Sequence, residues 1–209
     1  MKQLSPAHSR AESKSEMKIF VLPITLLLLA GSSGCDIFQT RDPQSPTQSN
    51  STFNPPVNAE IVLSNLQYAI QEDNTDNYIR CFSVTPSRPY DFIASQEARA
   101  NYPGLFNQWS LESERRYFQN LGTPANGAPS LIFSNQQTLT VSSDSVIYNM
   151  NYQLFFPHRR SNVPHLVQGN MQLYLGTDDQ HRWAIYRWQD LKTSSDSTWS
   201  YWKAIFSGS

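Results

Sequence analysis

An apolar residue at every second position of residues 145–156, with polar Asn149, Asn151 and Gln153 between them, constrains the fold of this chain more than any other feature. The apolar side chains fall there at every second position: Val146, Tyr148, Met150, Tyr152, Leu154 and Phe156. Because successive side chains of a β-strand point to opposite faces, this period of two predicts a long strand with one buried face and one solvated face. Residues 167–175 repeat the alternation, and residues 182–189 predict a third strand. Short polar connectors between the three strands predict an antiparallel meander.

Helical spacing dominates the chain before these strands. Residues 58–71 predict an amphipathic helix, whose apolar stripe comprises Val62, Leu66, Ala69 and Ile70. A second, shorter helix is predicted after it, with Asn74 or Thr75 as N-cap and with Tyr78, Cys81 and Phe82 on its inner side. Residues 109–121 predict a third helix with Ser110 as N-cap, and residues 90–93 predict a short strand before it. Helices followed by a long sheet indicate an α+β fold.

This order of elements is similar to the cone-shaped fold of the nuclear transport factor 2 superfamily. Residues 65–82 resemble its opening helical hairpin, with an acid at the bend, and Tyr90-Asp91-Phe92 resembles its first strand. Residues 183–190 resemble its last strand, so the resemblance spans about residues 57 to 191. It implies N-terminal helices packed on a curved antiparallel sheet, and it implies an activity only weakly, because one fold serves many functions.

The N-terminal region has the layout of an export signal. A largely apolar run, residues 19–30, follows Lys18 and precedes the small residues 31–34. This run is shorter than the roughly 20 apolar residues that a membrane-spanning helix needs. Translation can start at Met1 or at Met17, which follows a polar segment. We therefore assign residues 1–34 to a leader and signal peptide.

The residues before Cys35 resemble the lipobox of bacterial lipoproteins. Ser33, Gly34 and Cys35 match that motif, whereas Ser32 stands where Leu is usual. The resemblance implies a diacylglycerol on Cys35 and a palmitate-bearing lipoprotein in the bacterial cell envelope, with the membrane as its partner. We expect it to face the periplasm from the outer membrane, with the inner membrane as the alternative. An ordinary cleaved signal with an incidental cysteine is the competing interpretation.

The segment after Cys35 has the composition of a flexible linker. Residues 36–56 are rich in Pro, Ser, Gln and Asn and contain few apolar residues, so they cannot bury enough surface to offset their ordering entropy. We interpret residues 35–56 as the lipidated cysteine and a tether, and residues 57–209 as one α+β domain. The second cysteine, Cys81, is predicted to be a small buried hydrophobic residue without a disulfide partner.

Charge excludes one class of partner. Four of the 16 basic and two of the 17 acidic residues precede Cys35, which leaves 12 basic and 15 acidic residues and a net charge of −3 from there onward. Because a mildly acidic surface repels polyphosphate, we expect no nucleic-acid partner.

Sequence motifs assign no catalytic, cofactor-binding or metal-binding residue. The superfamily that the chain resembles includes enzymes such as ketosteroid isomerase, which implies a carboxylate base in the mouth of the cone, for which Asp91 with Tyr90 or Tyr148 is the candidate. An aspartate on a strand is more often a solvated or capping carboxylate. His158, His165 and His181 lack the spacing of a metal site and are predicted to lie on the surface.

Aromatic residues are concentrated at the C-terminus. They include Trp183, Trp188, Trp199 and Trp202. Exposed indoles would form a stacking platform for a sugar or a peptide. Alternatively, the tail folds back and its tryptophans close one end of the cone, which we favour because exposing so much apolar surface is costly.

Two functional hypotheses follow from these patterns. The first is a membrane-anchored, non-enzymatic binding or assembly module for an unknown small molecule or protein. The second is a small cavity enzyme of the ketosteroid isomerase or dehydratase type. The interior of the cone distinguishes the two hypotheses, because an open pocket with a buried carboxylate favours the enzyme and an interior filled by aromatic rings favours the module.

Overall fold

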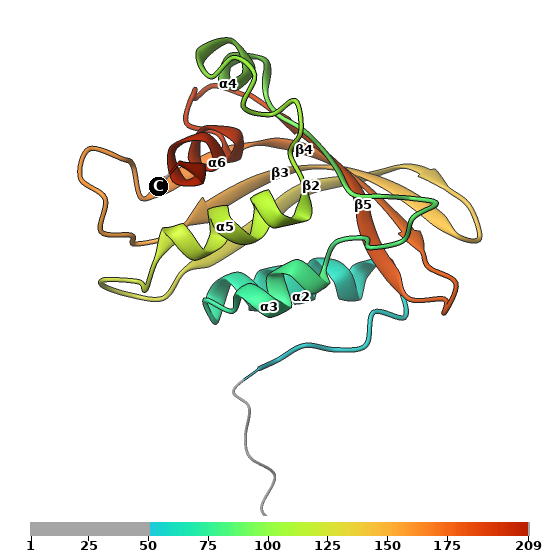
Figure 1. Cartoon of the computed structure of the whole chain (residues 1–209). Helices are drawn as coiled ribbons and strands as arrows, with labels where there is room; N and C mark the ends of the chain where they lie inside the picture. Colours follow the sequence, from blue (N-terminus) through green and yellow to red (C-terminus); the bar gives the residue numbers. More distant parts are fainter. Residues whose placement is uncertain (1–50, 209) are drawn as a thin grey trace, which may run out of the picture. The chain divides into compact units, whose positions relative to one another are not determined.

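A computed structural model describes residues 51–208, which form a curled sheet with helices packed against it (Figure 1). The predictions on the signal peptide, Cys35 and most of the tether lie outside these residues. The sheet has five strands in the order β1-β5-β4-β3-β2. Their bounds are Asp91–Ile93 (β1), Ser130–Val141 (β2), Ser145–Phe155 (β3), Leu166–Thr177 (β4) and Trp183–Leu191 (β5). All neighbouring strands are antiparallel except β1, which pairs in parallel with β5.

The three strands predicted from the alternating pattern are confirmed as β3, β4 and β5. Met150 of β3 stands opposite Met171 of β4, and Tyr148 stands opposite Leu173. All four side chains are buried, because the period of two in one strand meets the same period in its neighbour. The register therefore places the apolar sets of both strands in one core.

The three predicted helices are confirmed as α2 (Ala59–Gln71), α3 (Thr75–Arg80) and α5 (Leu111–Leu121). Each begins at a side-chain cap: the side chains of Asn58, Asn74 and Ser110 accept hydrogen bonds from the first-turn amides of these helices. The helices pack side by side, α2 against α3 and α3 against α5, and α2 also contacts β2 and β5. Within residues 51–208, none of the helices combines the length and the apolarity needed to span a bilayer.

Three elements were not predicted: α4 (Gln96–Asn101), α6 (Trp199–Ser207) and β2. Only Ala98 of α4 is buried, so this helix has no apolar stripe. In β2, register shifts after Ser134 and after Thr138 break the alternation, and most of its second half is exposed. The signal for α6 was present, because Trp199, Trp202 and Phe206 have the spacing of one helical face.

The last residues assigned to the tether are bound to the domain. Residues 51–56, here called the strap, run along α2 and α3. The side chain of the buried Asn65 accepts a hydrogen bond from the Asn54 amide (2.9 Å) and donates one to the Asn54 carbonyl (2.7 Å). At the end of the strap, the Pro56 carbonyl accepts from the Trp183 amide at 2.7 Å. The prediction of a flexible segment up to Pro56 is thus wrong for residues 51–56, because their backbone groups have partners in the domain.

Candidate functional site

Tryptophan side chains fill the interior between the sheet and α6. Trp188, Trp199 and Trp202 are each 0% exposed. The rings of Trp188 and Trp199 meet edge to face, with centroids 4.5 Å apart, and the Trp202 indole nitrogen donates to the Pro164 carbonyl at 3.0 Å. The C-terminal segment thus packs back against α5 and β4 as a helix, and its large rings belong to the core.

A buried ion pair, Glu114 of α5 with Lys203 of α6, lies beside these rings, and both side chains are 0% exposed. The Glu114 carboxylate also accepts hydrogen bonds from the phenols of Tyr78 (2.9 Å) and Tyr90 (2.6 Å) and from the indole nitrogen of Trp109 (2.8 Å). Because burial and the negative charge of Glu114 raise the pKa of both phenols, they remain protonated donors. Both oxygens of the Glu114 carboxylate thus accept from protein donors, Oε2 from Tyr78 and Oε1 from Tyr90, Trp109 and Lys203.

The Lys203 ammonium group is enclosed by aromatic faces. Its Nζ lies 3.4 Å from the centroid of the Phe92 ring and 3.8 Å from that of Trp188. Burial lowers the pKa of Lys203 to about 8, against the opposing effect of Glu114. The lysine is thereby held between a carboxylate and two rings, away from solvent.

A second buried carboxylate, Asp190 at the end of β5, caps α6. It accepts hydrogen bonds from the Tyr152 phenol (2.8 Å) and from the Ser200 amide (2.7 Å) and hydroxyl (2.5 Å). Burial raises the pKa of Asp190, although these donors and Lys203 oppose the shift. Ser200 lies in the first turn of α6 and Tyr152 lies on β3, so Asp190 fixes that helix on the sheet.

The three residues considered as a catalytic set do not come together. Asp91 is half exposed and pairs with Arg187 of the neighbouring strand at 3.0 Å. The Tyr90 phenol donates to Glu114, and the Tyr148 phenol donates to Glu60 of α2 at 2.5 Å. Asp91 is therefore a carboxylate of the sheet edge, and the buried carboxylates are Glu114 and Asp190.

Sequence reasoning missed both buried carboxylates. Glu114 lies on the buried face of α5, which it shares with Tyr117, Phe118 and Leu121. An acid within an apolar helical stripe is unusual, because a charge is buried only when it is paired. That signal could have identified Glu114 and prompted a search for a basic partner.

The surface prediction is wrong for His158, which is only 2% exposed. Its ring packs against Phe206 and Trp202 of α6, with centroids 4.9 and 5.5 Å away, and burial lowers its pKa. His165 and His181 are exposed, as predicted. Cys81 is buried, also as predicted, and burial raises the pKa of its thiol. Over residues 51–208, no group of three or more His, Cys, Asp or Glu side chains is placed to hold a metal ion.

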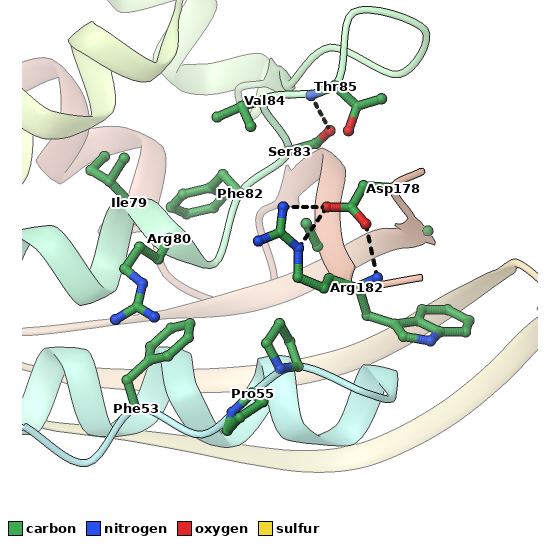
Figure 2. Close-up of a pocket in the computed structure, with 14 residues that line it drawn as sticks. Phe53, Pro55, Ile79, Arg80, Phe82, Ser83, Val84, Thr85, Asp178 and Arg182 are labelled. Carbon is green, nitrogen blue, oxygen red and sulfur yellow. Dashed lines mark hydrogen bonds and ion pairs between the residues drawn. The ribbon is translucent and has the colours of Figure 1, made fainter. Parts of the chain in front are cut away.

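The main concave site lies outside this core, between the strap, the end of α3 and the turn from β4 to β5 (Figure 2). We call it the strap groove. Its volume is about 460 Å³, within the range of small-molecule sites. Its lining comprises Phe53, Pro55, Pro56, Ile79, Arg80, Phe82, Ser83, Val84, Thr85, Gly176, Asp178, Arg182, Trp183 and Ala184. Trp183 is the only candidate residue from the sequence that lines this groove.

Backbone hydrogen bonds hold the walls of the strap groove in place. The Ser83 amide donates to the Ile185 carbonyl (2.8 Å) and the Ile185 amide to the Cys81 carbonyl (2.9 Å), which joins the segment after α3 to β5. The Asp178 carboxylate accepts from the Gln180 amide (2.8 Å) and from the Arg182 amide (2.9 Å), which closes the turn. Two of the segments that line the groove are therefore fixed by hydrogen bonds of the main chain, to carbonyl groups in one case and to the Asp178 carboxylate in the other.

Comparison with known proteins agrees with the architecture. No family model and no curated protein matches the chain. Among solved structures, a nuclear transport factor 2-like superfamily protein from Salmonella enterica serovar Typhimurium is similar, with 11% identity, a TM-score of 0.50, and coverage of 67% of this chain and 93% of its own. A protein provisionally assigned as a scytalone dehydratase, from Novosphingobium aromaticivorans, has 13% identity, a TM-score of 0.51, and coverage of 66% and 83%. These similarities confirm the α+β architecture expected from the sequence: the chain has the nuclear transport factor 2-like fold.

Proposed function

We propose that this protein is a lipid-anchored binding module of the bacterial cell envelope that holds its ligand in the strap groove and catalyses no reaction in the interior of the cone. The observation that carries this proposal is the filled interior. Trp188 and Trp199 occupy it, and the Glu114 carboxylate is enclosed by Lys203 and three further donors. The strap groove, in contrast, is a concave surface with room for a small ligand.

The competing function, a cavity enzyme, requires a carboxylate that a substrate can reach. General base catalysis depends on hydrogen-bond contact between the base and the proton that it removes. Glu114 and Asp190 are both 0% exposed, and Asp91 is neutralised by Arg187 on the sheet edge. The protein assigned as a scytalone dehydratase is 13% identical to this chain, and similarity at that level shows the fold but not the activity.

The anchor in this proposal is the diacylglycerol on Cys35. Fifteen residues separate Cys35 from the strap, since the strap begins at Ser51. A flexible segment of that length has a mean reach of roughly 20 Å. Since the strap forms one wall of the groove, the tether enters the domain at the binding site and keeps that site near the membrane.

Native mass spectrometry of the mature protein, extracted from its host membrane in mild detergent, tests the proposal. The wild type should carry a bound molecule that is lost in Ala184→Trp, because an indole at this lining position fills the groove. Ala184→Ser is the matched control and should retain the ligand. Retention in Ala184→Trp, or a wild type without any bound molecule, would contradict the proposal.

A further inference from the structure

The lining of the strap groove carries one net positive charge. Arg80 contributes from the end of α3, Arg182 from the start of β5, and the single acid is Asp178 (Figure 2). Burial opposes ionisation of Asp178, but hydrogen bonds from Arg182 and Gln180 hold its pKa below the usual value. Asp178 is thus ionised at neutral pH and neutralises Arg182, with 2.8 Å between its carboxylate and the guanidinium. The charge of Arg80 is left uncompensated within the lining.

Both guanidinium groups keep donors for a ligand. Arg80 uses Nη1 in a 3.1 Å hydrogen bond to the Asn77 side chain and has no carboxylate partner among residues 51–208. Arg182 directs Nε and Nη2 to Asp178. A guanidinium has five N–H donors, so Nε and Nη2 of Arg80 and Nη1 of Arg182 remain for a ligand.

The strap preorganises Arg80. The guanidinium carbon of Arg80 lies 3.7 Å from the centroid of the Phe53 ring, so the side chain is held flat against the strap. An arginine held this way loses less rotamer entropy when it binds an anion. A carboxylate is the planar acceptor that such a fork recognises best with two parallel hydrogen bonds.

Apolar surface makes up the remainder of the groove. Phe53, Pro55 and Pro56 line the groove from the strap, and Phe82 and Trp183 line it from the rest of the domain. These rings favour a ligand with an aliphatic or aromatic part, because its binding removes apolar surface of both the ligand and the groove from water.

From this combination we infer that the strap groove selects a monoanionic amphiphile, with a carboxylate on an apolar chain or ring. The carboxylate pairs with Arg80 and takes the free donor of Arg182, and the apolar body lies between the strap and Trp183. This inference rests on the proposed function, since it assigns a ligand class to the same groove.

Equilibrium dialysis of the mature, detergent-solubilised protein against a matched pair of probes tests the inference. The probes are 4-phenylbutyrate and its neutral isostere 4-phenylbutyramide, with detergent micelles alone as the blank. The acid should bind about tenfold more tightly than the amide, the usual effect of one charge-assisted hydrogen bond. Arg80→Gln should weaken binding of the acid by about tenfold and leave binding of the amide unchanged.

Two variants separate failure of this inference from failure of the proposed function. Arg116→Gln removes an exposed arginine of α5 that does not line the groove, and it should leave both probes unaffected. Ala184→Trp should abolish binding of both. If acid and amide bind the wild type with equal affinity and neither binds Ala184→Trp, the preference for an anion is overturned, but the groove remains the binding site. Binding of the acid that persists in Ala184→Trp would overturn both the proposed function and the carboxylate preference. Absence of saturable binding of the acid at millimolar concentration would overturn the ligand class.

Discussion

Lys203 and Glu114 form an ion pair in which neither side chain has any exposure to solvent, although they lie 89 residues apart in the chain. The pair joins the C-terminal helix α6 to α5. Taking two charges out of water is expensive, and the cost is offset only when each charge has further partners. Three aromatic donors on Glu114 and two rings around Lys203 supply those partners.

Loss of one member of this pair should destabilise the domain severely. Lys203→Met leaves an uncompensated buried carboxylate and should lower the free energy of unfolding by about 3–5 kcal/mol. Urea unfolding followed by tryptophan fluorescence measures this. The double variant Lys203→Met with Glu114→Leu should recover part of the loss, because it removes both charges. A single variant as stable as the wild type would show that the pair contributes nothing to the fold.

Truncation of the α6 tryptophans should be almost as damaging. Trp199→Ala and Trp202→Ala each empty a fully buried aromatic site, for which the usual cost is about 3–5 kcal/mol. Thermal denaturation should show markedly lower melting temperatures for both variants. Trp183→Ala, at the partly exposed groove position, is the control and should melt close to the wild type. Unchanged melting of Trp199→Ala and Trp202→Ala would place these rings outside the core.

Gly169→Ala should strain the centre of the sheet. An added Cβ would lie 2.7 Å from the Leu191 carbonyl oxygen and 2.8 Å from the Tyr152 hydroxyl, which itself bonds to Asp190. Overpacking of this kind costs about 1–3 kcal/mol. Gly208→Ala meets no atom within 4 Å and serves as the control in the same unfolding assay. Equal stability of the two variants would mean that the sheet relaxes around the added methyl group.

Asp73→Asn should stabilise the protein in a pH-dependent way. Burial raises the pKa of Asp73 from 3.8 to about 6, so the folded state favours the protonated form. The unfolded state therefore releases this proton first, and stability is lost as the pH rises from about 4 to 6. Asparagine avoids the loss and also tolerates the left-handed backbone at this position (φ 50°). The variant should gain up to about 1 kcal/mol over the wild type at pH 7 and nothing at pH 3.5; an equal gain at both pH values would assign the effect to the backbone.

Cys35→Ala tests the anchor. The variant should lack a lipid and should not undergo lipoprotein-type processing, because the thiol that carries the diacylglycerol is absent. Mass spectrometry of the wild-type mature N-terminus should find a lipid-modified Cys35. An unmodified N-terminus at another residue would overturn the lipoprotein assignment.

Periodic features of the sequence predicted the frame of the fold. The alternation from Val146 to Phe156 predicts a strand, and the stripe from Val62 to Ile70 predicts a helix. Each prediction is possible because a two-residue or 3.6-residue period follows directly from strand or helix geometry. β2 escaped prediction because its bulges shift the register within the strand. α6 escaped because it is only nine residues long and rich in aromatic residues, whose intrinsic helix propensity is modest.

The strap groove could not be predicted, since its walls come from three distant segments of the chain. The composition of residues 36–56 as a whole favours a flexible linker, but it does not show that Asn65 will bind the backbone of Asn54. Similarly, Arg80 and Arg182 are unremarkable in sequence and acquire a common role when α3 and the β4–β5 turn meet. Local periods in the sequence predict the helices and strands, whereas this groove depends on tertiary contacts between them.

Because the strap is at once the end of the tether and a wall of the groove, occupancy of the groove and the freedom of the domain to move are thermodynamically linked. A ligand that touches both Phe53 and the opposite wall favours the docked strap, and by reciprocity a docked strap favours the ligand. In the proposed lipoprotein, detachment of residues 51–56 would add up to about 20 Å of extended chain between the domain and its lipid. The empty domain would then reach farther from the membrane, and the ligand-bound domain would be held closer to it.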